Sequence, residues 1–98
     1  MYAYITPSAT VDLDDIWFTI ACDNQKRADN YLADLLKRMS TLAEFPRMGH
    51  RVEEIKKDMW VFPLDDYLIF YQITKKGITV ARVWHAKRDL TAIFFSEE

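Results

Sequence analysis

Residues 67–84 read YLIFYQITKKGITVARVW, and this stretch decides the fold. Its two halves, 67–73 and 78–84, are rich in β-branched and aromatic residues and flank the turn-forming segment Thr74-Lys75-Lys76-Gly77. Because so short a link joins antiparallel neighbours, the sequence predicts two paired strands here. The first of them is apolar at every position over 67–71, which predicts a central strand that is covered on both faces.

The remaining strands are expected on either side of this pair. Residues 50–55 and 59–62 have strand composition and are separated by Lys56-Lys57-Asp58. Pro63-Leu64-Asp65-Asp66 supplies the next turn, and residues 2–5 form a short strand near the start. The expected sheet is small and antiparallel, and the chain has no second helical layer left to cover its far face.

Two amphipathic helices are expected between the strand at 2–5 and the later strands. Thr6 can cap the first helix with Pro7 at its first position, and apolar residues follow at helical spacing: Ala9, Leu13, Ile16, Trp17 and Ile20. We interpret the nearby acidic residues as negative charges that suit the start of the helix dipole: Asp12, Asp14 and Asp15. Asp23-Asn24 ends the first helix and caps a second helix over about residues 25–44. The short link between them predicts an αα-hairpin.

These elements predict one α+β domain over residues 1–98, in the order β-α-α-β-β-β(-β). The two-helix hairpin packs on a small antiparallel sheet, and a short C-terminal tail or helix ends the chain. Half of the residues are hydrophobic and only two are glycine, which is typical of a compact fold rather than a disordered chain.

Composition also excludes several classes of function. With 13 Lys and Arg against 15 Asp and Glu, the net charge of -2 disfavours direct nucleic-acid binding. The single cysteine, Cys22, excludes an internal disulfide, and neither a membrane span nor a signal peptide is visible, so we expect a cytoplasmic protein. The two histidines and Cys22 make no metal-ligand pattern, and no glycine-rich phosphate loop is present, so no metal or cofactor is predicted.

Two groups of residues are candidates for binding rather than for catalysis. The first is a cationic cluster with an apolar tail near the end of the chain, where a target would bind: Arg82, His85, Lys87, Arg88, Phe94 and Phe95. The second supplies more large apolar surface than one helical hairpin can cover, and such patches mark interfaces: Trp17, Phe18, Trp60, Phe62 and Tyr71.

The ordered set of motifs along the chain resembles the ParE branch of the RelE/ParE toxin family. The resemblance rests on family-like spacing of the following residues, in order: Asp12-Leu13, Ile16-Trp17, Tyr31-Leu32, Leu35, Leu42-Ala43, Pro46, Gly49, residues 52–55, Phe62-Pro63, residues 67–71, Arg82-Val83, His85 and Arg88-Asp89. It implies a β-α-α order followed by an antiparallel sheet, inhibition of DNA gyrase, and a hetero-oligomer with a neutralising ParD-like antitoxin. The apolar group would then bind the antitoxin, and the cationic group would bind the target.

One position departs from the family pattern. Where similar chains carry Gly-Leu-Arg-Ser-Phe-Pro in the third strand, this chain reads Asp58-Met59-Trp60-Val61-Phe62-Pro63, so Trp60 stands at the position of the arginine. A cation is exchanged for a large apolar surface. Any contact that this arginine makes in relatives would have to become a packed contact here.

Two alternative functions remain open at this point. The first is metal-independent mRNA cleavage, ribosome-dependent or free, as in the RelE branch, with His85 as acid or base and with Arg82, Lys87 and Arg88 stabilising charge. That machinery is incomplete, because no tyrosine follows Tyr71 and because the side chains of Arg82 and His85 should point to opposite faces of a strand. The second is a degenerate, non-toxic protein that is kept as an antitoxin-binding partner.

Overall fold

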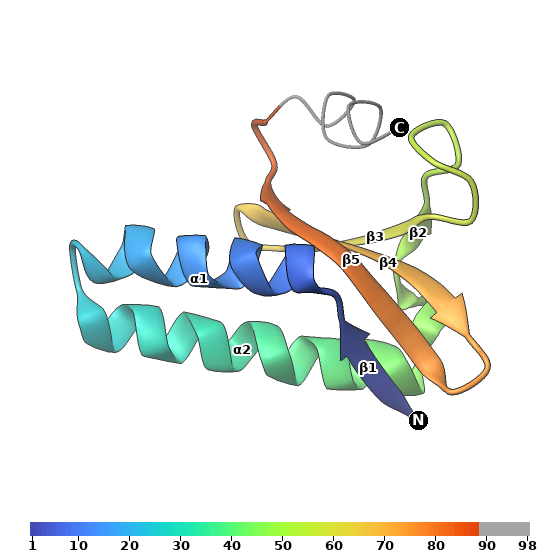
Figure 1. Ribbon diagram of the computed structural model, residues 1–98, viewed down its shortest axis with the longest axis horizontal. Coiled ribbons are helices and arrows are strands. Elements are labelled where there is room, and N and C mark those ends of the chain that lie inside the picture. Colours follow the sequence, from blue (N-terminus) through green and yellow to red (C-terminus); the bar gives the residue numbers. More distant parts are fainter. Residues whose placement is uncertain (89–98) are drawn as a thin grey trace.

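The computed structural model describes residues 1–88, and Figure 1 shows a helical hairpin packed against a curved sheet. The elements follow the order β1 (Tyr2–Ile5), α1 (Pro7–Ala21), α2 (Gln25–Glu44), a 3-10 turn (Pro46–Met48), β2 (His50–Arg51), β3 (Trp60–Leu64), β4 (Tyr67–Thr74) and β5 (Gly77–His85). The predicted α+β class and element order are confirmed. The C-terminal tail or helix that the sequence predicts lies outside the described residues.

The five strands form one sheet in the order β1-β5-β4-β3-β2. The predicted central strand is therefore confirmed as β4, which pairs antiparallel with both β3 and β5. The prediction of a purely antiparallel sheet is wrong, because β1 pairs parallel with β5. The chain returns from β1 through the whole hairpin and three strands before it reaches β5, and such a long connection permits the parallel arrangement.

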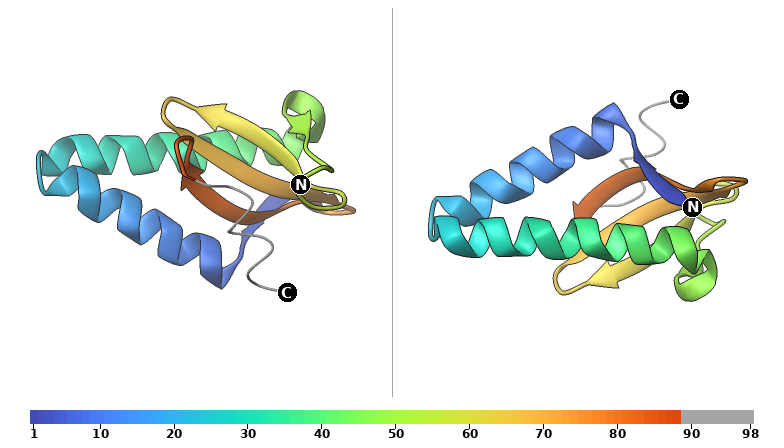
Figure 2. Two further views of the ribbon diagram at one scale, coloured as in Figure 1. Left: turned by 90° about the horizontal axis from the view of Figure 1, so that it is seen from above. Right: turned by 90° about the horizontal axis from the view of Figure 1, so that it is seen from below.

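Both helices begin where the sequence predicts. The Thr6 side chain accepts a hydrogen bond from the backbone N–H of Ala9, and the Asn24 side chain accepts one from Arg27. The two helices run antiparallel against each other, and their connecting turn projects away from the sheet (Figures 1 and 2).

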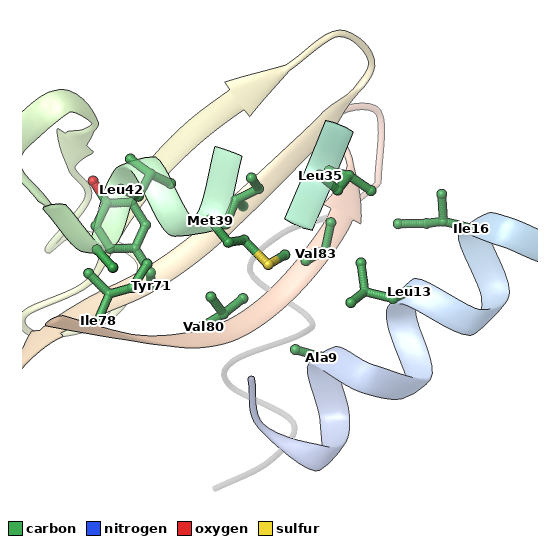
Figure 3. Close-up of a cluster of buried hydrophobic side chains, with 12 residues drawn as sticks. Ala9, Leu13, Ile16, Leu35, Met39, Leu42, Tyr71, Ile78, Val80 and Val83 are labelled. Carbon is green, nitrogen blue, oxygen red and sulfur yellow. The ribbon is translucent and has the colours of Figure 1, made fainter. Parts of the chain in front are cut away.

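The main core lies between the hairpin and one face of the sheet (Figure 3). Leu13 and Ile16 of α1 meet Leu35 and Met39 of α2 over Val83 of β5, and all five side chains are buried. Burying a side chain of this size contributes about 2 kcal/mol, so this layer is a large source of hydrophobic stabilisation.

The opposite face of the sheet carries a smaller apolar cluster around Phe70 and Met59. The sequence predicts a strand over residues 50–55, but the strand ends at Arg51 and the chain turns back, so this prediction is wrong beyond that residue. The Val52 N–H donates to the Met59 carbonyl at 2.8 Å, which closes a loop whose apolar residues pack beside Phe70. This loop supplies cover for the far face that the sequence left without an assigned layer.

The turn between β3 and β4 is shorter than expected. Pro63 and Leu64 belong to β3, and the link is only Asp65-Asp66, with Asp65 at a φ of 55°. Aspartate tolerates this left-handed conformation in tight turns. Pro63 therefore lies within β3, beyond the two residues of β3 that pair with β2. Its missing N–H is tolerated there because no strand of the described residues pairs with that side of Pro63.

Candidate interaction surfaces

The cationic cluster divides into one buried and two exposed positive charges. Arg82 donates from Nε to Asp12 Oδ2 at 2.8 Å and from Nη2 to Asp12 Oδ1 at 3.0 Å. The side chains are only 17% and 6% exposed, so this is a largely buried ion pair. Lys87 and Arg88 are exposed. Asp12 pairs with the Arg82 guanidinium, so Arg82 offers less free charge than the sequence suggests, and its place in the target-binding group stays a prediction.

Asp12 has a different role from the one we interpreted from the sequence. Its carboxylate also accepts the backbone N–H of Val83 at 3.0 Å. Strand β1 ends at Ile5, opposite Val80, so β5 continues beyond its parallel neighbour. The Asp12 carboxylate thus accepts the Val83 N–H, which has no strand partner at this point of the described sheet, and it links α1 to β5. It does not lie in the first turn of α1, where it would stabilise the helix dipole.

The aromatic ring of Trp84 contacts two guanidinium groups. Arg82 Cζ is 5.1 Å from the ring centroid and Arg88 Cζ is 4.2 Å from it. Contacts of this kind are attractive and hold the guanidinium against the ring. Trp84 thus links the buried ion pair to the exposed Arg88 at the end of β5.

His85 lies at the same end of the sheet, half-buried on the face opposite Trp84. Its ring contacts the ring of Tyr67 edge-on at 5.2 Å, and its Nδ1 accepts the backbone N–H of Lys87 at 3.1 Å. Burial and the nearby Asp66 raise the pKa of Tyr67, while Arg88 lowers it. The backbone bond to His85 is the one expected for an imidazole that ends a strand. Phe94 and Phe95 lie outside the described residues.

The apolar group divides into two surfaces and one buried residue. Tyr71 is fully buried, its hydroxyl donates to the Pro46 carbonyl at 2.6 Å, and it accepts the Gly49 N–H at 3.2 Å. Its predicted place on an antitoxin-binding surface is therefore wrong, since the side chain has no area to offer a partner. Its hydroxyl instead fixes the chain that leaves α2.

The first apolar surface lies on the outer side of α1. Phe18 is 65% exposed, and it borders a hollow that Trp17 and Leu32 also line, together with Asp14 and Asp15. The indole Nε1 of Trp17 donates to Asp29 on α2 at 2.7 Å, which holds its ring beside the hollow. We call this set of residues the α1 surface.

The second apolar surface is the outer part of β3. Trp60 and Phe62 are half-buried and lie on the face of the sheet that the hairpin covers. A guanidinium group lies over each ring. Arg51 Cζ is 5.9 Å from the centroid of the Trp60 ring, and Arg38 Cζ is 5.4 Å from the centroid of the Phe62 ring. We call these four residues the β3 surface. The sequence missed the two arginines, because they come from α2 and β2 and only the folded sheet brings them to these rings.

Neither a metal nor a membrane site is found in residues 1–88. In this part of the chain, no three His, Cys, Asp or Glu residues are grouped so that they could hold a metal ion. No helix of the described part is long and apolar enough to cross a membrane.

Known proteins are similar to this chain in both sequence and fold. The family described as "ParE toxin of type II toxin-antitoxin system, parDE" matches residues 3–90. The chain belongs to the ParE toxin family. It is 30% identical to Toxin ParE1 of Mycobacterium tuberculosis, in the strains CDC 1551 / Oshkosh and H37Rv, over 88 residues that cover 88% of this chain and 90% of the relative. This ParE-type protein is therefore a toxin of the type II toxin-antitoxin class.

A solved structure supports the same architecture. A chain of "Chromosomal ParDE TA system from P. aeruginosa" superimposes with a TM-score of 0.75, covering 89% of this chain and 97% of that chain. The sequence identity of 17% is low, so this match establishes a shared fold. The ParE arrangement of hairpin and sheet is thus retained although most side chains differ.

Proposed function

We propose that this ParE toxin inhibits DNA gyrase by binding it, and that a ParD-like antitoxin neutralises the toxin in a hetero-oligomeric complex. The observation that carries the proposal is the buried pair of Arg82 with Asp12. It engages one of the three cations that the alternative mechanism, RNA cleavage, would use, and leaves only the exposed Lys87 and Arg88 near His85. Binding through exposed charges and rings requires no such catalytic group.

The RNA-cleavage alternative needs three groups within reach of one phosphate. A base must take the 2′-hydroxyl proton, a cation must stabilise the phosphorane, and an acid must protonate the leaving oxygen. In the described residues, the Arg82 guanidinium is turned toward Asp12, and His85 Nδ1 already accepts a backbone N–H. This arrangement disfavours the endoribonuclease function of the RelE branch.

The target surface that we propose is the end of β5. Lys87 and Arg88 are exposed there in a protein whose net charge is -2, so they form a local positive area. Arg88 is held against Trp84, and an arginine packed on an aromatic ring is a common anchor in protein interfaces. His85 and Tyr67 border this area and supply further aromatic contact.

The antitoxin surfaces that we propose are the α1 surface and the β3 surface. The α1 surface combines the exposed Phe18 with two carboxylates, which suits an amphipathic segment with basic residues. The β3 surface carries two arginines over aromatic rings, which suits acidic residues of the same partner. A segment that folds on binding could follow both surfaces. The name of the structural relative, a ParDE system, agrees with such a partner.

One parallel assay tests the proposal. The purified protein is added to DNA gyrase in a supercoiling reaction and to translating ribosomes with mRNA, each with and without a ParD-like antitoxin. We expect inhibition of supercoiling that the antitoxin relieves, and no mRNA cleavage. Codon-register cuts that disappear in His85→Ala or Arg88→Ala would establish the RNase alternative instead. Inactivity in both assays, with retained antitoxin binding, would identify a degenerate toxin.

A further inference from the structure

The two edges of the sheet differ in how they are protected against pairing with another strand. At one edge, β2 covers only Val61 and Trp60 of β3, and the uncovered part of β3 contains Pro63, which lacks an N–H. The charged turn Asp65-Asp66 follows at once. Proline and charge are common protections of an edge strand, so this edge is closed to further pairing.

The other edge, β1, has no such protection. Residues 1–5 read MYAYI, with no charged side chain and no proline, and β5 is the only neighbour of β1 in the part of the chain that the structure describes. Tyr2 and Tyr4 are 57% and 53% exposed. An uncharged, apolar edge strand of this kind is a template for another strand.

The backbone of β1 presents free hydrogen-bonding groups at this edge. The Tyr2 N–H donates to the Lys76 carbonyl at 2.9 Å, and the Thr6 N–H donates to the Val80 carbonyl at 3.2 Å. Since alternate residues of a strand point their N–H and C=O groups to opposite sides, Ala3 and Ile5 direct theirs away from β5. A strand placed there would bond to both residues.

A groove of about 540 Å³ runs beside this edge, between β1 and the second half of α2. Ala3 and Ile5 line one wall, and the other wall includes Leu36 and Phe45, which are 41% and 62% exposed. The charged side chains of the groove are one Lys37 and one Glu44, so its side chains carry no net charge. An added strand would therefore find both backbone partners and apolar contacts.

The geometry points to a second copy of this chain as the occupant, with the two β1 strands paired antiparallel about a two-fold axis at Tyr4. Ala3 of each copy then exchanges hydrogen bonds with Ile5 of the other, and the two Tyr4 side chains lie directly opposite each other. Aromatic pairs at such positions are favourable. The two α2 helices run antiparallel on the same face of the joined sheet.

Charge complementarity favours a second copy over a charged partner segment. A two-fold axis reverses the direction of α2, so the Lys37 end of one helix faces the Glu44 end of the other. The strand itself has no charged side chains, so the paired strands bring no like-charged side chains together. The same surface patch serves both copies, as a two-fold symmetric interface requires.

The first test measures the mass of the purified protein against concentration by analytical ultracentrifugation. We expect a monomer–dimer equilibrium that Tyr4→Lys weakens at least about tenfold, because two lysines then lie opposite each other. Val11→Lys is the matched control, since Val11 is 58% exposed on α1 and does not line the groove beside β1, and it should leave the equilibrium unchanged. A protein that stays monomeric at all concentrations would overturn the proposal.

A disulfide cross-link provides a second test, in which the variant should trap the dimer instead of weakening it. Opposed side chains at such a pair have Cβ atoms about 5 Å apart, so Tyr4→Cys in a Cys22→Ser background should form a disulfide-linked dimer on mild oxidation. Val11→Cys in the same background should not. A dimer that forms while Tyr4→Cys fails to cross-link would place the interface elsewhere and refute the proposed pairing.

Amide exchange separates self-pairing from pairing with another protein. We expect the amides of Ala3 and Ile5 to gain protection as the concentration of the isolated toxin rises. Protection that appears only when the antitoxin is added would show that an antitoxin strand occupies this edge. That result would overturn self-association as the use of β1.

Discussion

The carboxylate of Asp12 and the guanidinium of Arg82 meet at two points, 2.8 and 3.0 Å apart, although 70 positions separate them in the sequence. The same carboxylate accepts the N–H of Val83. The Asp12 side chain of α1 thus forms an ion pair with Arg82. It also accepts a backbone hydrogen bond from β5 just beyond the point where the parallel strand β1 ends. The pair joins the hairpin to the sheet and holds the Arg82 guanidinium on Asp12.

The first prediction concerns the cost of breaking this pair. Asp12→Ala leaves the Arg82 charge and the Val83 N–H without their partner, so we expect the free energy of unfolding to fall by about 3–5 kcal/mol. A domain of this size has a total stability of about 5–10 kcal/mol, so the loss should be large in urea unfolding.

Two matched variants define this measurement. Asp15→Ala removes an exposed carboxylate from the same helix and should change the stability by less than about 0.5 kcal/mol. The double variant Asp12→Leu with Arg82→Met removes both charges and should be more stable than Asp12→Ala. If Asp12→Ala costs no more than Asp15→Ala, the pair does not hold α1 to β5.

Much of the fold could be predicted from the sequence because its signals are local. Thr6 with Pro7 fixes the start of α1, and Asn24 fixes the start of α2, through contacts within four residues. The apolar run 67–71 identifies the central strand by composition alone. The parallel pairing of β1 with β5 carries no local signal, since it joins the two ends of the described chain.

The candidate surfaces were harder to predict because burial depends on contacts that are distant in sequence. Arg82 and Tyr71 both have the residue types of an interface, yet Asp12 takes the charge of the first and the core encloses the second. Arg38 joins Phe62 only after α2 has packed on the sheet. Sequence can therefore identify candidate residues, while their accessibility is a property of the packed domain.

The second prediction concerns the α1 surface. Phe18→Asp should weaken binding of the ParD-like antitoxin by at least about 2 kcal/mol, because it places a charge where we propose an apolar anchor. The fold should be unaffected, since Phe18 is 65% exposed. Titration calorimetry measures the affinity, and Met48→Asp, at 40% exposure, is the control that should bind normally. Equal affinities for the two variants would exclude Phe18 from the interface.

The third prediction concerns Trp60 of the β3 surface. Trp60→Asp should also weaken antitoxin binding by at least about 2 kcal/mol, whereas Trp60→Phe should keep most of the affinity. Because the Trp60 ring is stacked on Tyr71 at 6.3 Å, the aspartate variant will lose some stability. Affinities are therefore compared at a temperature where unfolding curves show both variants folded. Unchanged affinity in Trp60→Asp would remove this residue from the interface.

The fourth prediction concerns stability at alkaline pH. Burial and the neighbouring Asp65 raise the pKa of Tyr31, whose hydroxyl donates to the Leu64 carbonyl at 2.7 Å. Burial likewise raises the pKa of Tyr67 and of Tyr71. The folded protein thus keeps these protons to a higher pH than the unfolded chain, whose tyrosines titrate near pH 10. Their contribution is fully present below about pH 10 and is lost as the pH rises toward the folded pKa.

Urea unfolding between pH 8 and 11.5 measures this loss. Each such phenol should lower the free energy of unfolding by up to about 1.4 kcal/mol per pH unit above pH 10. Tyr31→Phe should reduce the slope by one such contribution, because it removes the Tyr31 phenol. A Tyr31→Phe protein with the wild-type slope would show that the Tyr31 phenol ionises equally in both states.

The last prediction concerns the end of β5. Lys87→Glu with Arg88→Glu should abolish growth inhibition, because it reverses the positive area that we propose meets the target. Both side chains are exposed, so the fold and antitoxin binding should persist, with a loss of at most about 1 kcal/mol from the Arg88 contact with Trp84. Lys75→Glu with Lys76→Glu makes the same charge change in the β4–β5 turn and should leave the protein toxic. If both double variants are equally toxic, these cations have no part in target binding and the search moves to the helical hairpin. If both are equally inactive but folded, the effect comes from net charge rather than from this surface.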